Sequence, residues 1–296
     1  MSEEIRATGC FYAHPWAETV SKRLWIALGH RKFVEPVEMR KVMSELVSWE
    51  RPYFEPGGGD AEQFYVVFVD PPTEWAISRS TYRCAGIPDG LQLGGYGPGT
   101  HPDVVDGFRT GPIWEQARAQ VADLVPEIEA AQSCVVLRGN VGDQTTLDYH
   151  RDVVGALKLL CDQGAVAILD MFSISWWRPE DWTARAFAVE KPAPKSHVIL
   201  WVTEEPSGTL WLHKRGMLKY GRPDIGLRNV PKHRQEDAAH LVNRFIEMLA
   251  FGAIVPDGQA IRVDGLPDGM TTQTLGGPED VEFNNRHIAI EWPKEA

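Results

Sequence analysis

The chain has 296 residues, a mass of 33.1 kDa and a formal net charge of −11 at pH 7. This length suffices for one large or two ordinary domains around a sizeable apolar core, and a content of 43% hydrophobic and 24% charged residues is typical of a globular protein. The acidic balance disfavours binding to nucleic acid or to an anionic membrane surface, since both interactions need positive charge on the protein. We therefore expect neither kind of partner.

The cysteines and the N-terminus predict the compartment. Cys10, Cys84, Cys134 and Cys161 are far apart, and no pair forms a Cys-x-x-Cys motif. Reduced thiols in a reducing compartment are the simplest interpretation. The N-terminal "MSEEIRATGC" is polar and acidic, unlike a secretory signal, and no apolar run approaches the roughly 18 residues that span a bilayer. These features predict a cytoplasmic protein.

The first 130 residues are predicted to contain strands, helices and one long connection. Residues 5–12 and 64–70 are apolar and predict strands. Glycine and proline are frequent over residues 86–112, without any periodicity, and predict an irregular connection. Apolar residues at helical spacing predict helices at 15–28, 36–49 and 112–130, the last with a kink at Pro126.

The clearest unit of the chain lies near residues 133–169. "SCVVLRG" at 133–139 predicts a strand, and 145–164 carry the apolar stripe of a helix that ends at Gly164. "AVAIL" at 165–169 predicts a second strand. A strand, a helix and a strand with short links indicate a crossover between parallel strands.

The remaining part of the chain predicts further strands and one long helix. "HVILWV" at 197–202 is apolar on both faces, which is typical of a central strand. Residues 233–251 have one apolar face and predict a helix, whereas apolar and polar residues alternate over 286–292 as in a half-exposed strand. Other strands are expected at 209–213, 260–264 and 271–275.

These elements together predict an α+β fold with mixed sheets, a βαβ unit near 133–169 and packed amphipathic helices. "EKPAPK" at 190–195 is the best candidate for a boundary. We expect an N-terminal α/β lobe over residues 1–190 and a C-terminal α+β lobe over 195–296, with a single composite domain as the alternative.

A dense group of tryptophans follows the βαβ unit. If a short helix starts after Arg178, Pro179 takes its first position, where a missing N–H is harmless. Trp177 and Trp182 then occupy the two positions of a hydrophobic staple, and Trp176 faces the other way. We favour this folding role for the three rings over the alternative, a platform for a ligand.

One candidate site lies at the ends of the predicted parallel strands, where open α/β sheets bind ligands. Arg138, Asn140 and Asp143 follow the first strand, and Asp170 ends the second. Converging there, these residues would form a polar crevice for an enzyme or a small-molecule binder. The alternative is a structural ion pair between Arg138 and Asp170 beside a solvated loop.

The second candidate site is a basic segment at residues 213–234. Seven lysines and arginines lie there against the single acid Asp224, although the chain as a whole is acidic. Such an excess suggests binding of an acidic protein partner or an anionic ligand. The alternative is neutralisation by acids from elsewhere, such as Glu279, Asp280 and Glu282. The candidate binding residues are Lys214, Arg215, Lys219, Tyr220, Arg222 and Arg228.

Standard catalytic and metal-binding motifs are not found in the sequence. There is no Gly-x-Ser-x-Gly elbow, no His-Glu-x-x-His zinc helix and no phosphate loop ending in Gly-Lys-Ser/Thr. The histidines are scattered, without a partner at zinc-finger spacing. We therefore expect no metal and no cofactor, and we favour a non-catalytic protein over an enzyme.

Several motifs resemble an uncharacterised bacterial family, a domain of unknown function, over about residues 133–292. They are "TLWLHKRGMLKYGRPDI", "NRFIEMLAFG", "FNNRHIAIEW" and the Phe-Ser, Trp-Trp and Pro-Glu-Asp-Trp groups of residues 172–182. The resemblance implies no known activity, cofactor or catalytic residue, although such families often occur among toxin-immunity genes. The leading hypothesis is a non-catalytic, immunity-like binding protein that uses the basic segment. The alternatives are an enzyme using the crevice and a structural subunit of a homo-oligomer.

Overall fold

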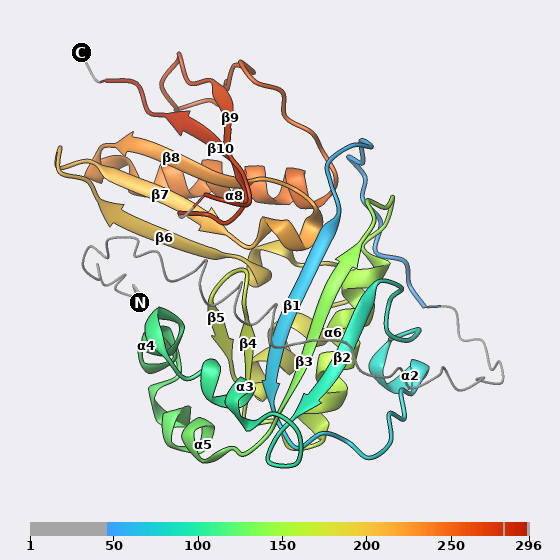
Figure 1. Ribbon diagram of the computed structural model, residues 1–296. Helices are drawn as coiled ribbons and strands as arrows, with labels where there is room; N and C mark the ends of the chain where they lie inside the picture. The colour runs from blue at the N-terminus through green and yellow to red at the C-terminus, as the bar shows by residue number, and fades with distance from the viewer. Residues whose placement is uncertain (1–45, 281, 295–296) are drawn as a thin grey trace.

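The computed structural model describes residues 46–280 and 282–294 and shows an α+β fold with two five-stranded sheets (Figure 1). The predicted elements at 5–12 and 15–28, and most of that at 36–49, lie outside the described residues. The first sheet has the order β2-β3-β1-β4-β5, and all its neighbouring strands are antiparallel. Its strands are β1 (Ala61–Phe68), β2 (Leu91–Tyr96), β3 (Cys134–Val141), β4 (Ala167–Asp170) and β5 (Ser175–Trp177).

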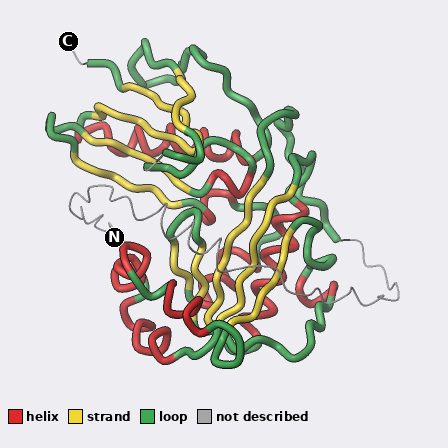
Figure 2. The backbone as a smooth tube through the Cα atoms, viewed as in Figure 1, coloured by secondary structure: helices red, strands yellow, loops and turns green. Residues whose placement is uncertain are grey.

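Helices cover both faces of the first sheet (Figure 2). Residues Tyr65 and Leu137 belong to a core cluster with α6 (Asp148–Asp162), whereas Val66 and Val136 point to the other side. That other face packs against α3 (Pro102–Gly107), α4 (Gly111–Gln120) and α5 (Val125–Ala130). The alternation of side chains along each strand therefore divides the sheet between two cores.

The predicted strand–helix–strand unit exists as β3, α6 and β4, with one difference. Both β3 and β4 are antiparallel to β1, which lies between them, so they run in the same direction without being neighbours. The last four residues of β1, Tyr65–Phe68, are buried on both faces of the sheet. The prediction placed β3 and β4 side by side, whereas this apolar strand lies between them.

Two predictions between residues 86 and 130 were wrong in detail. The supposed irregular connection contains β2 and α3. Gly94 and Gly95 belong to β2, where a Cβ would collide with the Tyr96 ring or with Pro71. The supposed continuous helix is divided into α4, a 3-10 turn at Ala122–Leu124 and α5. The division precedes Pro126, which lies in the first turn of α5, where a proline is tolerated.

The second sheet is mixed and has the order β6-β7-β8-β10-β9, with only β8 and β10 parallel. The strand predicted as central, now β6, lies at an edge, and its residues are all partly or fully exposed. The strand predicted at 260–264 is reduced to one bridge between Ala260 and Thr271. The strands are β6 (Ile199–Glu204), β7 (Leu210–Arg215), β8 (Asp224–Val230), β9 (Thr272–Gly276) and β10 (Arg286–Glu291).

The long helix α8 (Gln235–Ala250) covers one face of the second sheet through its buried side chains. We call the other face the outer face; it looks toward the reader in Figure 1. A single buried cluster includes residues of both sheets together with α6 and α8. Shorter elements are α2 (Arg79–Tyr82), α7 (Pro179–Asp181), a π-helix at Trp182–Phe187 and 3-10 helices at Pro194–His197, Met217–Tyr220 and Lys232–Arg234.

The folding role predicted for the tryptophans is confirmed. Helix α7 begins after Arg178, with proline in its first turn. The rings of Trp177 and Trp182 meet edge to face with centroids 5.3 Å apart, whereas Trp176 stacks on Phe68 in the other core. All three are buried. Among the described residues, no helix combines the length and apolar character needed to cross a membrane.

Candidate functional site

The four residues of the predicted crevice do not converge. In the first sheet, Tyr65 pairs with Asp170, and its neighbour Phe64 pairs with Arg138. Because successive side chains of a strand point to opposite faces, Arg138 and Asn140 lie on the face opposite to Asp170. The crevice and the alternative Arg138–Asp170 ion pair are therefore both wrong, since β1 separates the two strands.

Asp170 instead pairs with Lys219 of the basic segment. The ammonium group of Lys219 also donates a hydrogen bond to the carbonyl of His197, and both charged side chains are fully buried. Asp170 Oδ1 accepts hydrogen bonds from the backbone N–H groups of Phe172 and Ser173, at 3.1 and 3.3 Å. Burial lowers the pKa of Lys219, and the Asp170 carboxylate opposes that shift. The pair joins β4 of the first sheet to the 3-10 helix between β7 and β8.

Asp143, the fourth crevice residue, binds two arginines. Its Oδ1 accepts hydrogen bonds from Arg51 at 2.9 Å and from Arg222 at 3.1 Å, and its Oδ2 accepts the N–H of Gly58 at 3.2 Å. Arg222 also donates to the carbonyls of residues 55, 252 and 253. Sequence reasoning missed Arg51, which precedes the first sheet and has no local signal. The network holds residues 51–58 against residues 220–222 and the C-terminal end of α8.

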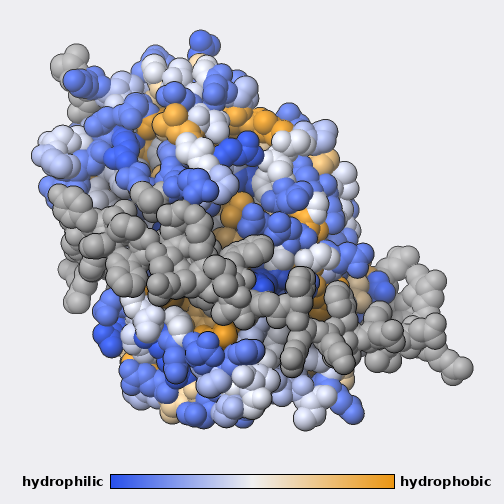
Figure 3. Space-filling view, viewed as in Figure 1, coloured by the Kyte–Doolittle hydropathy of each residue, from blue (hydrophilic) through white to orange (hydrophobic). Residues whose placement is uncertain are grey.

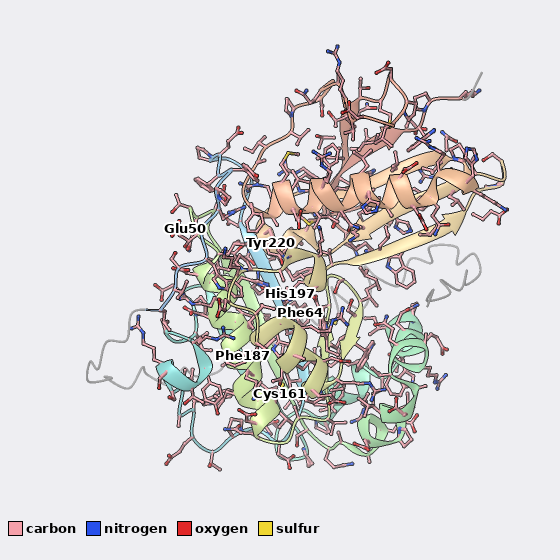
Figure 4. All side chains as sticks on the ribbon, turned by 180° about the vertical axis from the view of Figure 1, so that it is seen from behind. Glu50, Phe64, Cys161, Phe187, His197 and Tyr220 are labelled. Atoms are coloured by element: carbon pink, nitrogen blue, oxygen red, sulfur yellow. The ribbon has the colours of Figure 1, made fainter. Side chains whose placement is uncertain are left out.

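Tyr220 and His197 lie between the two halves of the molecule, as Figure 4 shows from behind. The Tyr220 hydroxyl is 3.5 Å from Nε2 of His150, and the rings of His150 and His197 meet edge to face at 4.6 Å. Burial lowers the pKa of His150 to about 3 and that of His197 well below its ordinary value. Both imidazoles are neutral at pH 7, as expected of polar groups inside a core.

The basic segment is therefore not an exposed basic surface. Lys214, Lys219, Tyr220 and Arg222 are all buried. The ammonium group of Lys214 points toward α8 and donates to Asn243 at 2.8 Å, and burial together with Lys195 lowers its pKa to about 8. Strand alternation and the 3-10 helix at Met217–Tyr220 turn these side chains inward. This part of the prediction is wrong.

Arg215 and Arg228 lie on the outer face of the second sheet. Arg215 donates to the carbonyl of Phe283 at 3.3 Å. The guanidinium of Arg228 donates to Glu205 at 3.1 Å and to Glu282 at 3.2 Å. The alternative of neutralisation by acids from elsewhere is thus confirmed for Arg228, through Glu282.

Aromatic rings gather around Arg228 on the outer face. The Trp211 ring lies 3.9 Å from the guanidinium carbon of Arg228 and stacks on His213 with centroids 4.0 Å apart. Phe283 stacks on His287 at 4.1 Å. Burial lowers the pKa of His213 to about 3, and the pKa of His287 is lowered by burial against the opposing charge of Asp280. Sequence reasoning did not single out these rings as a group, although the alternation in β7 and β10 places Trp211, His213 and His287 on one face.

A hollow of about 290 Å³ opens among these residues, and we call it the outer hollow. Gly226 and Ala289, adjacent on β8 and β10, line it together with Trp211 and His287. The acids Asp280, Glu282 and Glu291 also line it. In the space-filling view of Figure 3, the upper part of the molecule, which contains this sheet, shows apolar patches between hydrophilic areas.

No family model, no curated protein and no solved structure matches the chain. The resemblance to an uncharacterised bacterial family stays a prediction. Within the described residues, no three His, Cys, Asp or Glu side chains are placed to hold a metal ion.

Proposed function

We propose that the protein is a non-catalytic binding protein whose binding site is the outer hollow, and that its partner is a basic protein. Three acids, Asp280, Glu282 and Glu291, line the hollow against one cation, Arg228, which is neutralised by Glu205 and Glu282. The surplus of negative charge at this hollow carries the proposal. An immunity-like role in the cytoplasm, as the resemblance suggests, belongs to the same proposal.

The charge of the partner is opposite to the one expected from the basic segment. With Lys214, Lys219 and Arg222 buried, the reason to expect an acidic partner or an anionic ligand is lost. The chain carries a net charge of −11, which favours encounter with a basic partner at low salt. An enzyme site at Asp170 would require the two sheets to separate, because the Asp170 side chain is fully buried.

The test is affinity capture from a lysate of the source organism, with the tagged full-length chain as bait. The wild type is compared with Glu282→Lys/Glu291→Lys and with the control Asp89→Lys/Glu129→Lys. Asp89 and Glu129 are exposed on the first-sheet half of the molecule, so the control makes the same change of net charge elsewhere. We expect a basic protein with the wild type and the control and none with the first variant.

The captured protein is then purified and titrated into each of the three baits by calorimetry. Direct binding that is lost only in Glu282→Lys/Glu291→Lys supports the proposed site. Identical captured proteins for all three baits would refute it, as would a partner that is acidic.

A further inference from the structure

Several buried polar side chains surround the ion pair of Asp170 and Lys219 without completing their own hydrogen bonds. We call this group the buried polar centre; its members are Tyr65, Asp170, Ser173, His197 and Lys219, all at most 2% exposed. Within the described residues, no group forms a hydrogen bond with the Tyr65 hydroxyl, the Ser173 hydroxyl or either ring nitrogen of His197. Polar groups buried in proteins nearly always have a partner, so these four atoms need one.

The contacts of the centre bring its members together. Tyr65 on β1 lies directly opposite Asp170 on β4, and the side chains of opposite residues share one face of a sheet. Ser173 donates its backbone N–H to Asp170 at 3.3 Å. Lys219 binds both Asp170 and the carbonyl of His197. The residues with unpartnered atoms therefore surround a single ion pair.

The backbone beside the centre is crowded and strained. Gly216 has a φ of 113°, and a Cβ there would lie 3.2 Å from both the Ser173 Cβ and the carbonyl oxygen of His197. Ile174, the neighbour of Ser173, has a φ of 54°, which is rare for a β-branched residue. Such strain persists where the surrounding contacts impose it, and it is often found at sites with a role beyond packing. The segment that carries Ser173 is therefore held close to His197 at a conformational cost.

We propose that ordered water molecules bind in the buried polar centre and complete the hydrogen bonds of Tyr65, Ser173 and His197. A hydroxyl group both donates and accepts, and a neutral imidazole has one nitrogen of each kind, so the ligand must do both as well. Water does so, and a buried water typically has about three protein partners. An anion would face the Asp170 carboxylate, and a cation would face the Lys219 ammonium group. The burial of the centre also favours the smallest ligand with these properties.

Bound water would connect the two halves of the molecule. Tyr65 belongs to β1, and Ser173 to the turn between β4 and β5, whereas His197 ends the 3-10 helix that precedes β6. A water shared by Ser173 and His197 would join the halves nearly as well as a direct hydrogen bond. The junction would then be held by a hydrated polar centre as well as by the shared apolar core.

The first test removes single oxygen atoms from the full-length chain and measures the Tm by calorimetry. If water binds the Tyr65 hydroxyl, Tyr65→Phe deprives that water of a partner, and we expect the Tm to fall by roughly 2–4 °C. If the hydroxyl has no partner, its removal relieves the cost of burying it, and the Tm should stay the same or rise. Ser173→Ala should lower the Tm for the same reason as Tyr65→Phe.

Two other tyrosines provide matched controls. Tyr149→Phe removes a buried hydroxyl that donates to the carbonyl of Lys219 at 3.0 Å, so it gives the loss due to a known hydrogen bond. Tyr53→Phe, at a residue that is 56% exposed, should leave the Tm unchanged. A Tm of Tyr65→Phe equal to or above that of the wild type, beside a lowered Tm of Tyr149→Phe, would overturn the proposal.

A high-resolution crystal structure of the full-length wild type then identifies the ligand. Electron density for a water within hydrogen-bond distance of at least two of Tyr65, Ser173 and His197 would support the proposal. Density for a protein group or a larger ligand in that place would overturn it, even if both variants lower the Tm. So would a centre that contains no density for a ligand.

Discussion

Lys219 and Asp170 form a fully buried ion pair between β4 and the 3-10 helix that links β7 and β8. Removing one charge leaves the other uncompensated in the core, so we expect Asp170→Asn to lower the free energy of unfolding by about 3–5 kcal/mol. The double variant Asp170→Asn/Lys219→Met should lose less than the sum of the two single variants, because the pair interacts. Urea denaturation followed by tryptophan fluorescence measures all three. Strictly additive losses would contradict a coupled pair.

Gly226 lines the outer hollow and lies against the ring of Trp211. A Cβ there would lie 3.2 Å from Trp211 Nε1 and 3.4 Å from Phe283 Cζ. We expect Gly226→Ala to change the free energy of unfolding by no more than about 1 kcal/mol, since crowding is partly offset by a stiffer strand. Binding of the captured basic protein should weaken several-fold. Gly142→Ala, with open space around it, is the control, and equal affinities of the two variants would count against the hollow.

The burial of the basic residues could not be predicted from the sequence, because the residues that they bind are distant along the chain. Lys219 and Asp170 are separated by 49 positions, and Arg222 and Asp143 by 79. The sequence shows that the segment is rich in basic residues. Whether their side chains are buried depends on which elements pack against the segment in the fold. Asp143 and Asp170 were recognised as candidates, and the structure gives each of them an unforeseen partner.

At the scale of elements, α6 and the 3-10 helix at Pro194–His197 bring His150 and His197 together in the core. Burial lowers the pKa of His150 from 6.5 to about 3, with Lys219 as the second cause. As the pH falls, His150 therefore becomes protonated in the unfolded chain before it does so in the folded protein. The contribution of His150 to the free energy of unfolding keeps its full value above pH 6.5 and decreases between pH 6.5 and pH 3. Each such histidine contributes a slope of about 1.4 kcal/mol per pH unit between its two pKa values.

We expect the free energy of unfolding of the wild type to fall more steeply between pH 6 and pH 4 than that of His150→Phe, as measured by urea denaturation at about five pH values. Asp224 acts in the opposite direction, because burial raises its pKa to about 6 and its protonation favours the folded state. That contribution is common to both proteins and cancels in the comparison. Equal slopes would show that His150 does not titrate in this range.

Elements were predictable where the signal is local. In β10, the buried Ile288 and Ile290 alternate with partly or fully exposed residues, as predicted for a half-exposed strand. The helix start after Arg178 follows equally from neighbouring residues. The position of β6 at an edge and the insertion of β1 between β3 and β4 depend on pairings between distant segments, which periodicity does not encode.

For the whole molecule, the choice between two lobes and one composite domain is open to a direct test. The strands of the two sheets lie on either side of residues 190–195, but one buried cluster contains residues of both. Asp143 and Arg222 add a charged link across the same junction. Because unfolding either sheet would expose part of this shared core, we expect the described part of the chain to unfold as a single cooperative unit.

Differential scanning calorimetry of the full-length chain should then give one transition, with a calorimetric enthalpy equal to the van't Hoff enthalpy. Arg222→Ala leaves the Asp143 carboxylate and several carbonyls without their donor, so it should lower the Tm of that transition without splitting it. Arg262→Ala, a change of the same kind at an exposed residue between α8 and β9, should leave the Tm almost unchanged. Two resolved transitions in the wild type would contradict the composite domain. Two transitions in Arg222→Ala alone would show that the charged link, and not the apolar core, couples the sheets.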